Sequence, residues 1–123
     1  MRVRDCIVAA ASALGQSAVA VLRLSGSDSA AILARCIQLD EEQLRARPRT
    51  LRLSRFLDVD GSVLDQVLVA FMPGPRSYTG EDLAEVHAHG GRAVVGALLE
   101  RLLQEGARPA RAGKVTRRAL ENG

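Results

Sequence analysis

Strand-type segments follow one another directly in this chain, and their order is the feature that most restricts the possible folds. Apolar residues alternate with polar ones, or run together for a few residues, in segments 6–12, 17–26, 50–58, 62–73 and 81–89. Both patterns are typical of β-strands with one or two buried faces. We expect two hairpins: segment 6–12 pairs with 17–26 across a turn at 14–17, and segment 50–58 pairs with 62–73 across a turn at 58–61.

Helical patterns are fewer. We expect one helix from Ser27 or Asp28, either of which can cap it, to about Leu39. A second helix is predicted from the helical spacing of apolar residues in 92–105, and Gly106 ends it. A third begins in 114–123. The charged segment 39–49 contains Pro48 and is interpreted as a connecting loop, and 107–113 as a short extended link.

The predicted order is therefore β-β-α-β-β-β-α-β-α, which is not the strict alternation of a doubly wound fold. We predict an α+β fold with a mixed, largely antiparallel sheet that carries helices. At 123 residues, the chain 1–123 has the length of one domain.

Composition permits several partners without requiring one. The net charge is +3, and 16 of the 17 basic residues are arginine, so nucleic acid or an anionic ligand is permitted. Two Phe, one Tyr and no Trp argue against a base-stacking platform. Cys6 and Cys36 form no motif and are interpreted as buried free thiols of a cytoplasmic chain. No segment has the length of a membrane span or the pattern of a signal peptide.

The run 73–91, PGPRSYTGEDLAEVHAHGG, holds both histidines and the only tyrosine. Pro73 and Pro75 exclude regular structure at its start. Glu85, His87 and His89 share one face of the following strand, where they are compatible with a metal site. Polar groups that line a sheet edge or pocket are the favoured interpretation, and no catalytic residue is predicted.

Two features of this region suggest a ligand site and have a structural alternative. Glu85 lies in an apolar strand and needs a donor, from a planar heterocycle with adjacent N–H groups or from Arg23 in an ion pair. Gly90 and Gly91 precede a helix, where they permit either an anion at the helix N-terminus or a tight turn with positive φ. Sequence leaves both choices open.

Three blocks of the sequence resemble one family. VAVLRLSG (19–26), DGSVLDQVLVAFMPGPRSYTGEDLAEVHAHGG (60–91) and ARPARAGKVTRRALENG (107–123) resemble, in this order, the N-terminal domain of the tRNA-modification GTPases called MnmE or TrmE. The resemblance covers nearly the whole chain, and its central block is long and specific. Segment 11–18 and Ala112–Val115 depart from the family pattern.

The resemblance implies a module that binds 5-formyltetrahydrofolate and forms a homodimer, similar in fold to the folate domain of glycine-cleavage aminomethyltransferase. With MnmG (GidA), the full proteins of the family modify the wobble uridine (U34) of certain tRNAs. GTP, Mg²⁺ and K⁺ would bind only to their GTPase domain. Because this chain has no GTPase domain, we do not expect it to hydrolyse GTP alone.

The folate contacts implied by the resemblance fall on Arg23 and Glu85, with Ser25, Tyr78, Thr79, Gly90 and Gly91 as weaker candidates. The chain ends at Gly123, one residue before a lysine that the family uses, so we expect a fragment whose folate site is incomplete. Two alternatives stay open: an arginine-rich tRNA-binding module, and a structural dimerisation domain that binds no folate.

Overall fold

The computed structural model describes residues 6–10 and 19–110. Its helices and strands follow the order β1-β2-α1-α2-β3-β4-β5-α3-β6. The strands are β1 (Ile7–Ala10), β2 (Val19–Ser25), β3 (Arg52–Leu57), β4 (Val63–Met72), β5 (Leu83–His89) and β6 (Arg108–Pro109). The helices are α1 (Ser29–Ala34), α2 (Glu41–Ala46) and α3 (Arg92–Gln104).

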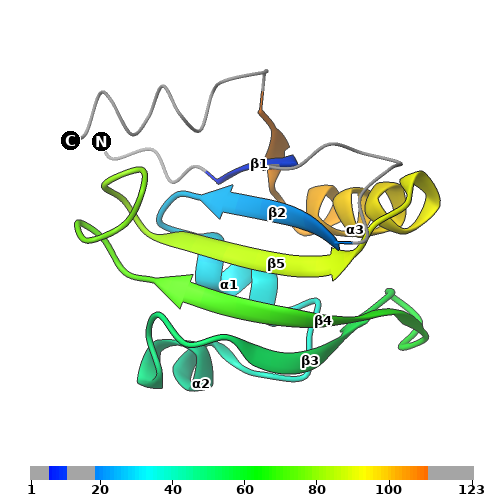
Figure 1. Ribbon diagram of the computed structural model, residues 1–123, viewed down its shortest axis with the longest axis horizontal. Helices are drawn as coiled ribbons and strands as arrows, with labels where there is room; N and C mark the ends of the chain where they lie inside the picture. Colours follow the sequence, from blue (N-terminus) through cyan, green and yellow to red (C-terminus); the bar gives the residue numbers. More distant parts are fainter. Residues whose placement is uncertain (1–5, 11–18, 111–123) are drawn as a thin grey trace.

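These strands form one sheet in the order β3-β4-β5-β2-β1-β6 (Figure 1). Both predicted hairpins are present, because β1 pairs antiparallel with β2, and β3 with β4. The only parallel pairing in the described chain joins β1 to β6. The fold is therefore α+β with a mixed, largely antiparallel sheet, as predicted.

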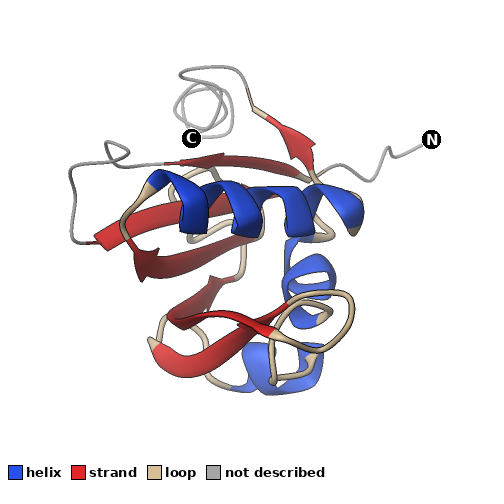
Figure 2. Cartoon of the chain, turned by 90° about the vertical axis from the view of Figure 1, so that its right-hand side faces the viewer, coloured by secondary structure: helices blue, strands red, loops and turns tan. Residues whose placement is uncertain are grey.

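The helices gather on one side of the sheet (Figure 2). From β2, Leu22 and Leu24 point into the core cluster on this side, which also contains Ile32 of α1 and Leu98 of α3. The other side of β2 carries Val21 and Arg23, which are half-buried, and Val19, which is 51% exposed. This side of the sheet, which lies away from the core, is called the open face.

Strand β5 shows the same alternation. Ala84, Val86 and Ala88 are buried in the core, whereas Glu85 and His87 are half-buried on the open face. Antiparallel pairing places β5 between β2 and β4, so these two polar side chains lie near the middle of the sheet. The predicted division of this strand into an apolar and a polar face is confirmed.

The prediction of a loop in 39–49 was wrong, because α2 lies within it. Asp40 and Gln43 form a capping box, in which each side chain accepts a hydrogen bond from the other residue's backbone N–H. Leu44 is 2% exposed and belongs to the core. One buried leucine and a good cap are enough for this short helix, although its other side chains are polar or exposed.

Helix α1 ends at Ala34, earlier than the predicted Leu39. Beyond it, Ile37 forms an isolated bridge with Phe56, and the backbone N–H of Leu57 donates to the carbonyl of Cys36. Pairing with β3 thus replaces the last helical turn. Asp28 occupies the N-cap position but makes no side-chain capping hydrogen bond.

Two predictions, the turn at 14–17 and the helix in 114–123, lie outside the described residues. Among the described residues, α3 agrees with the predicted helix 92–105, and Glu105 is its C-cap. The extended link also agrees, because β6 lies in it.

Both cysteines are buried and free, as predicted. Burial raises the pKa of the Cys36 thiol to about 11, so this thiol stays protonated at neutral pH. Nearby, the buried guanidinium of Arg101 donates to the carbonyls of Leu57 and Arg35 and to the carboxylate of Glu105. This residue ties α3 to the ends of β3 and α1, a role that the sequence did not reveal.

Candidate functional site

Arg23 and Glu85 face each other across β2 and β5, in the middle of the open face. The two residues are direct partners in the strand register, and Arg23 Nε lies 2.9 Å from Glu85 Oε2. Their side chains are 35% and 19% exposed, so the pair is neither fully solvated nor sealed in the core. The structure therefore contains the ion pair that the sequence left as one alternative, and both partners still reach solvent.

Glu85 is held in its charged form. Burial acts to raise the pKa of this carboxyl, but hydrogen bonds from Arg23 and His87, with the positive charge of Arg23, lower it below its ordinary value. The ring Nε2 of His87 lies 3.2 Å from Glu85 Oε1. Among the described residues, each carboxylate oxygen thus has one partner, and a carboxylate oxygen has a second lone pair that can accept another hydrogen bond.

Residues 73–82 form a loop between β4 and β5, here called the 73–82 loop, and it brings Tyr78 over the ion pair. The guanidinium carbon of Arg23 lies 5.5 Å from the centre of the Tyr78 ring, within range of a cation–π contact. Tyr78 is 50% exposed, so its ring is also accessible from outside. A planar ligand at Glu85 would therefore have an aromatic face beside it.

The 73–82 loop is joined to the end of β2. Ser25 Oγ is hydrogen-bonded to Thr79 Oγ1 at 2.8 Å and to Glu81 Oε1 at 2.9 Å. The backbone N–H of Gly26 donates to the carbonyl of Asp82 at 2.9 Å. Ser25 and Thr79 are fully buried, so their hydroxyl groups attach the buried side of the loop to β2. Sequence reasoning missed Glu81, although it lies within the run that was singled out.

The shape of the 73–82 loop depends on close backbone packing. A Cβ atom on Gly74 would lie 2.9 Å from the backbone of Glu81, closer than real Cβ contacts allow. The N–H of Gly74 also donates to Asp82 Oδ1. Since Pro73 and Pro75 provide no donor, these interactions replace the regular hydrogen bonds that the segment lacks. The prediction of irregular structure is confirmed.

The predicted site residues do not all lie together. Arg23, Ser25, Tyr78 and Thr79 gather around Glu85, near the start of β5. Gly90 and Gly91 follow the other end of that strand, which at about 3.3 Å per residue places them some 15–20 Å away.

Gly91 is the N-cap of α3 and has φ of 129°. A Cβ atom there would meet nothing within 4 Å, so the backbone conformation is what requires glycine. This geometry supports the tight-turn interpretation at Gly91, whereas Gly90 does not have positive φ. The structure therefore separates Gly90 and Gly91 from the cluster around Glu85.

The two histidines have separate partners. His87 contacts Glu85, whereas both the backbone N–H and the ring Nδ1 of His89 face the carboxylate of Asp65, at 2.9 and 2.7 Å. In residues 6–10 and 19–110, no three His, Cys, Asp or Glu side chains are grouped to hold a metal ion. Both histidines line a groove on the open face, which agrees with the favoured interpretation of polar groups that line a sheet edge or pocket.

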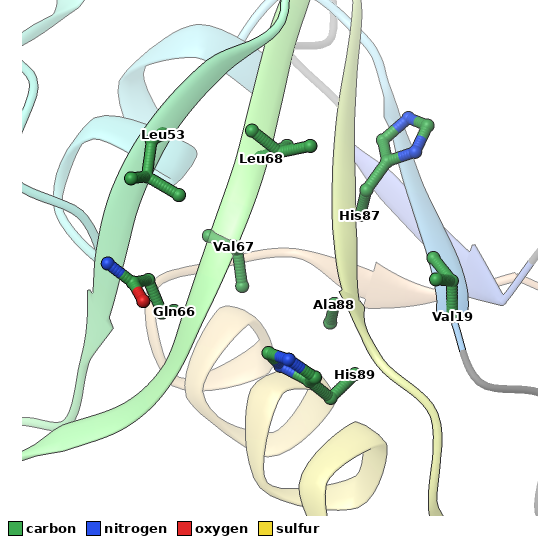
Figure 3. Close-up of a pocket in the computed structure, with 8 residues that line it drawn as sticks. All are labelled: Val19, Leu53, Gln66, Val67, Leu68, His87, Ala88 and His89. Carbon is green, nitrogen blue, oxygen red and sulfur yellow. The ribbon is translucent and has the colours of Figure 1, made fainter.

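A groove of about 470 Å³ lies on the open face, and one of its lining residues, His87, contacts Glu85. Its volume is within the usual range for small-molecule sites. Figure 3 shows its side chains, among which the rings of His87 and His89 point in different directions. The groove is walled by the apolar Val19, Leu53 and Leu68 and by the polar Gln66, His87 and His89. His87 is thus shared between the groove and the Glu85 cluster.

Five arginines lie in segment 45–55, which an arginine-rich tRNA-binding module could use, and three of them are engaged within the protein. Arg45 pairs with Glu41 and lies over the Phe71 ring. Arg49 donates to two loop carbonyls, and Arg52 to the carbonyl of Gln43. Contacts inside the protein thus account for these three guanidinium groups, which weakens the interpretation of the segment as a phosphate-binding surface.

Among the described residues, the helices do not have the length and hydrophobicity of a membrane span.

Comparison with known proteins identifies the family. The family model described as "GTP-binding protein TrmE N-terminus" matches residues 6–123. Among curated proteins, the tRNA modification GTPase MnmE of Caulobacter vibrioides is 52% identical over 120 residues, which are 97% of this chain and 25% of the relative.

The MnmE proteins of Phenylobacterium zucineum and Akkermansia muciniphila are 49% and 47% identical, over 97% and 95% of this chain. The chain spans 26% of the length of each. Because the family model covers nearly the whole chain and about half of the aligned residues are identical, the chain belongs to the MnmE (TrmE) family of tRNA modification GTPases and corresponds to their N-terminal domain.

Proposed function

We propose that this chain is a folate-binding domain that takes a tetrahydrofolate derivative such as 5-formyltetrahydrofolate, with Arg23 and Glu85 as its principal contacts. The observation that carries the proposal is a charged carboxylate, partly exposed on a sheet face and surrounded by Arg23, His87 and Tyr78. Family membership supports it, because the sequence resemblance implies that the folate contacts of the family fall on these two residues.

The residues fit the chemistry of a pterin ring. Such a ring carries adjacent N–H and NH₂ donors, and a carboxylate that keeps a second lone pair on each oxygen can accept both. Tyr78 provides an aromatic face beside that position. The chain's own contribution is to bind and orient the ring, and the bound folate would supply a one-carbon group.

Calorimetry with 5-formyltetrahydrofolate tests the proposal. We expect the wild-type chain to bind and Glu85→Ala to lose detectable binding, because the variant has no acceptor for the ring donors. Glu41→Ala is a matched control, since it also removes a carboxylate paired with an arginine, on α2. Equal binding heats for wild type and Glu85→Ala would show that Glu85 is not part of the site.

The same domain is proposed to hold two copies together. Val19, Leu53 and Leu68 are 51%, 64% and 39% exposed on the open face, where they line one groove, and a contiguous exposed apolar patch is typical of an interaction surface. Sedimentation velocity should give a dimer for the wild type and a shift toward monomer for Leu53→Glu, with Val59→Glu, an exposed turn residue, as the control. A monomeric wild-type chain would contradict dimerisation.

In the cell, the domain is proposed to work as part of a cytoplasmic tRNA modification GTPase. Its full-length form would act with MnmG on the wobble uridine of tRNA, and GTP, Mg²⁺ and K⁺ would bind to the GTPase domain. A complementation assay tests this role: a full-length protein carrying this domain should restore wobble-uridine modification in a strain that lacks its MnmE. A protein with Glu85→Ala in the domain should not restore the modification.

A further inference from the structure

We infer that Arg49 is a positioning residue that sets the shape of the 73–82 loop and thereby the place of Tyr78 over Arg23. Its effect on ligand binding rests on the proposed function, whereas its effect on the loop does not. Arg49 lies between α2 and β3, well before the loop in the chain, and no sequence pattern singled it out.

Three carbonyl groups near the start of the loop accept hydrogen bonds from this one residue. The backbone N–H of Arg49 donates to the carbonyl of Phe71 at 2.8 Å. Its guanidinium Nη2 donates to the carbonyls of Pro73 at 3.3 Å and Arg76 at 2.7 Å. Since prolines at 73 and 75 prevent a regular ladder here, Arg49 supplies donors that a neighbouring strand would otherwise provide.

The backbone of Arg49 is itself unusual. Its φ is 60°, and no other non-glycine residue in 6–10 and 19–110 has positive φ. Residues with a Cβ atom rarely adopt this conformation, and they do so mainly where surrounding contacts hold them in it. Here the backbone and the side chain of Arg49 both reach the same segment, Phe71 to Arg76, and these contacts account for the strained conformation.

Arg49 and β2 hold the loop from two sides. On one side Ser25 contacts Thr79 and Glu81, and on the other the guanidinium of Arg49 contacts the carbonyls of residues 73 and 76. Tyr78 lies between these two attachments, where its ring reaches Arg23. The position of Tyr78 therefore depends on Arg49 through the backbone of the loop.

The chain offers its own spectroscopic probe. Tyr78 is the only tyrosine and there is no tryptophan, so tyrosine emission reports on the 73–82 loop alone. Arg49→Asn removes the guanidinium and keeps a residue that tolerates positive φ. Arg49→Lys keeps the charge, but its ammonium nitrogen reaches less far from the backbone than Nη2 does. Arg47→Asn, at the exposed C-cap of α2, is the matched control.

We expect acrylamide to quench Tyr78 emission about twice as effectively in Arg49→Asn as in wild type, because the released ring becomes more accessible. Affinity for 5-formyltetrahydrofolate should fall about tenfold, because the Tyr78 ring is no longer held beside the ligand. Arg49→Lys should give an intermediate result in both measurements, and Arg47→Asn should match wild type.

The two measurements separate the inference from the proposed function. Unchanged Tyr78 quenching in both folded Arg49 variants would overturn the positioning role. If Tyr78 quenching increases in the Arg49 variants but the wild-type chain does not bind 5-formyltetrahydrofolate, the positioning role is supported and the proposed function is contradicted. Hydrogen exchange of residues 73–82 decides the matter if Arg49→Asn is poorly folded: faster exchange in Arg49→Lys than in wild type would support the role, and equal exchange would overturn it.

Discussion

At the scale of single residues, the state of Glu85 depends on competition between burial and partners. Burial alone would raise the pKa of this carboxyl and favour its neutral form. The hydrogen bonds from Arg23 and His87 reverse the effect, and the native pKa falls below the ordinary value of 4.5. Glu85 is therefore ionised throughout the neutral range and available as an acceptor.

This lowered pKa predicts a pH-dependent contribution to stability. A carboxyl with a depressed native pKa stabilises the fold above the unfolded pKa, near 4.5, and loses this contribution as the pH falls through the native pKa. At pH 7, Glu85→Gln should therefore lower the free energy of unfolding by about 0.5–1 kcal/mol, an estimate reduced for partial exposure. Urea denaturation at neutral pH and at a pH below the unfolded pKa measures the difference, which should shrink in acid. The same difference in the free energy of unfolding at both pH values would contradict the predicted pH dependence.

At the scale of structural elements, the 73–82 loop shows how one glycine permits a close backbone contact. Gly74 packs against the backbone of Glu81, and Glu81 contacts Ser25 of β2. The loop is therefore an ordered element, although it contains no helix or strand. Its order comes from side chains and backbone groups that lie far apart in the sequence.

Two glycine substitutions should consequently have opposite effects. Gly74→Ala should lower the free energy of unfolding by about 1–3 kcal/mol, because the new methyl group forces the backbone of Glu81 to move. Gly96→Ala should raise it by up to about 1 kcal/mol, since Gly96 lies within α3 and its Cβ position is open. Thermal denaturation of the two variants measures the contrast. Similar melting temperatures for both would exclude the close contact.

At the scale of the whole molecule, the fold is a sheet with one covered and one open face. Helices α1 and α3 share a single core with β2, β4 and β5. The polar cluster and the groove both lie on the other face, where Glu85 and His87 project away from that core. Stability and ligand binding therefore depend on opposite faces of the same strands.

This division predicts where large truncations are tolerated. Leu98→Ala should lower the free energy of unfolding by about 2–5 kcal/mol, because Leu98 is fully buried between α3 and the sheet. Leu103→Ala, on the same helix but 38% exposed, should change it by about 0.5 kcal/mol. Chemical denaturation of both variants tests the assignment of the faces. Equal losses would show that α3 packs differently.

Much of the fold and part of the site could be predicted from local patterns. Alternation in β5 predicted which side of the strand Glu85 and His87 occupy, and two glycines predicted the start of α3. The helix α2 was missed because its only buried residue is Leu44, and a single apolar residue produces no period. The early end of α1 was missed because Ile37 pairs with Phe56, a partner that lies beyond α2 in the chain.

By itself, the sequence determined the fold class and the family and drew attention to Arg23 and Glu85, because each depends on local pattern or on matching motifs. Only the tertiary structure decided that these two side chains form a pair, that Tyr78 lies over Arg23, and that Gly90 and Gly91 follow the other end of β5. It also revealed the contacts of Arg49 with the 73–82 loop. The physical reason is distance along the chain: pairs such as Arg23 and Glu85 are brought together by strand order and register, which no local pattern encodes.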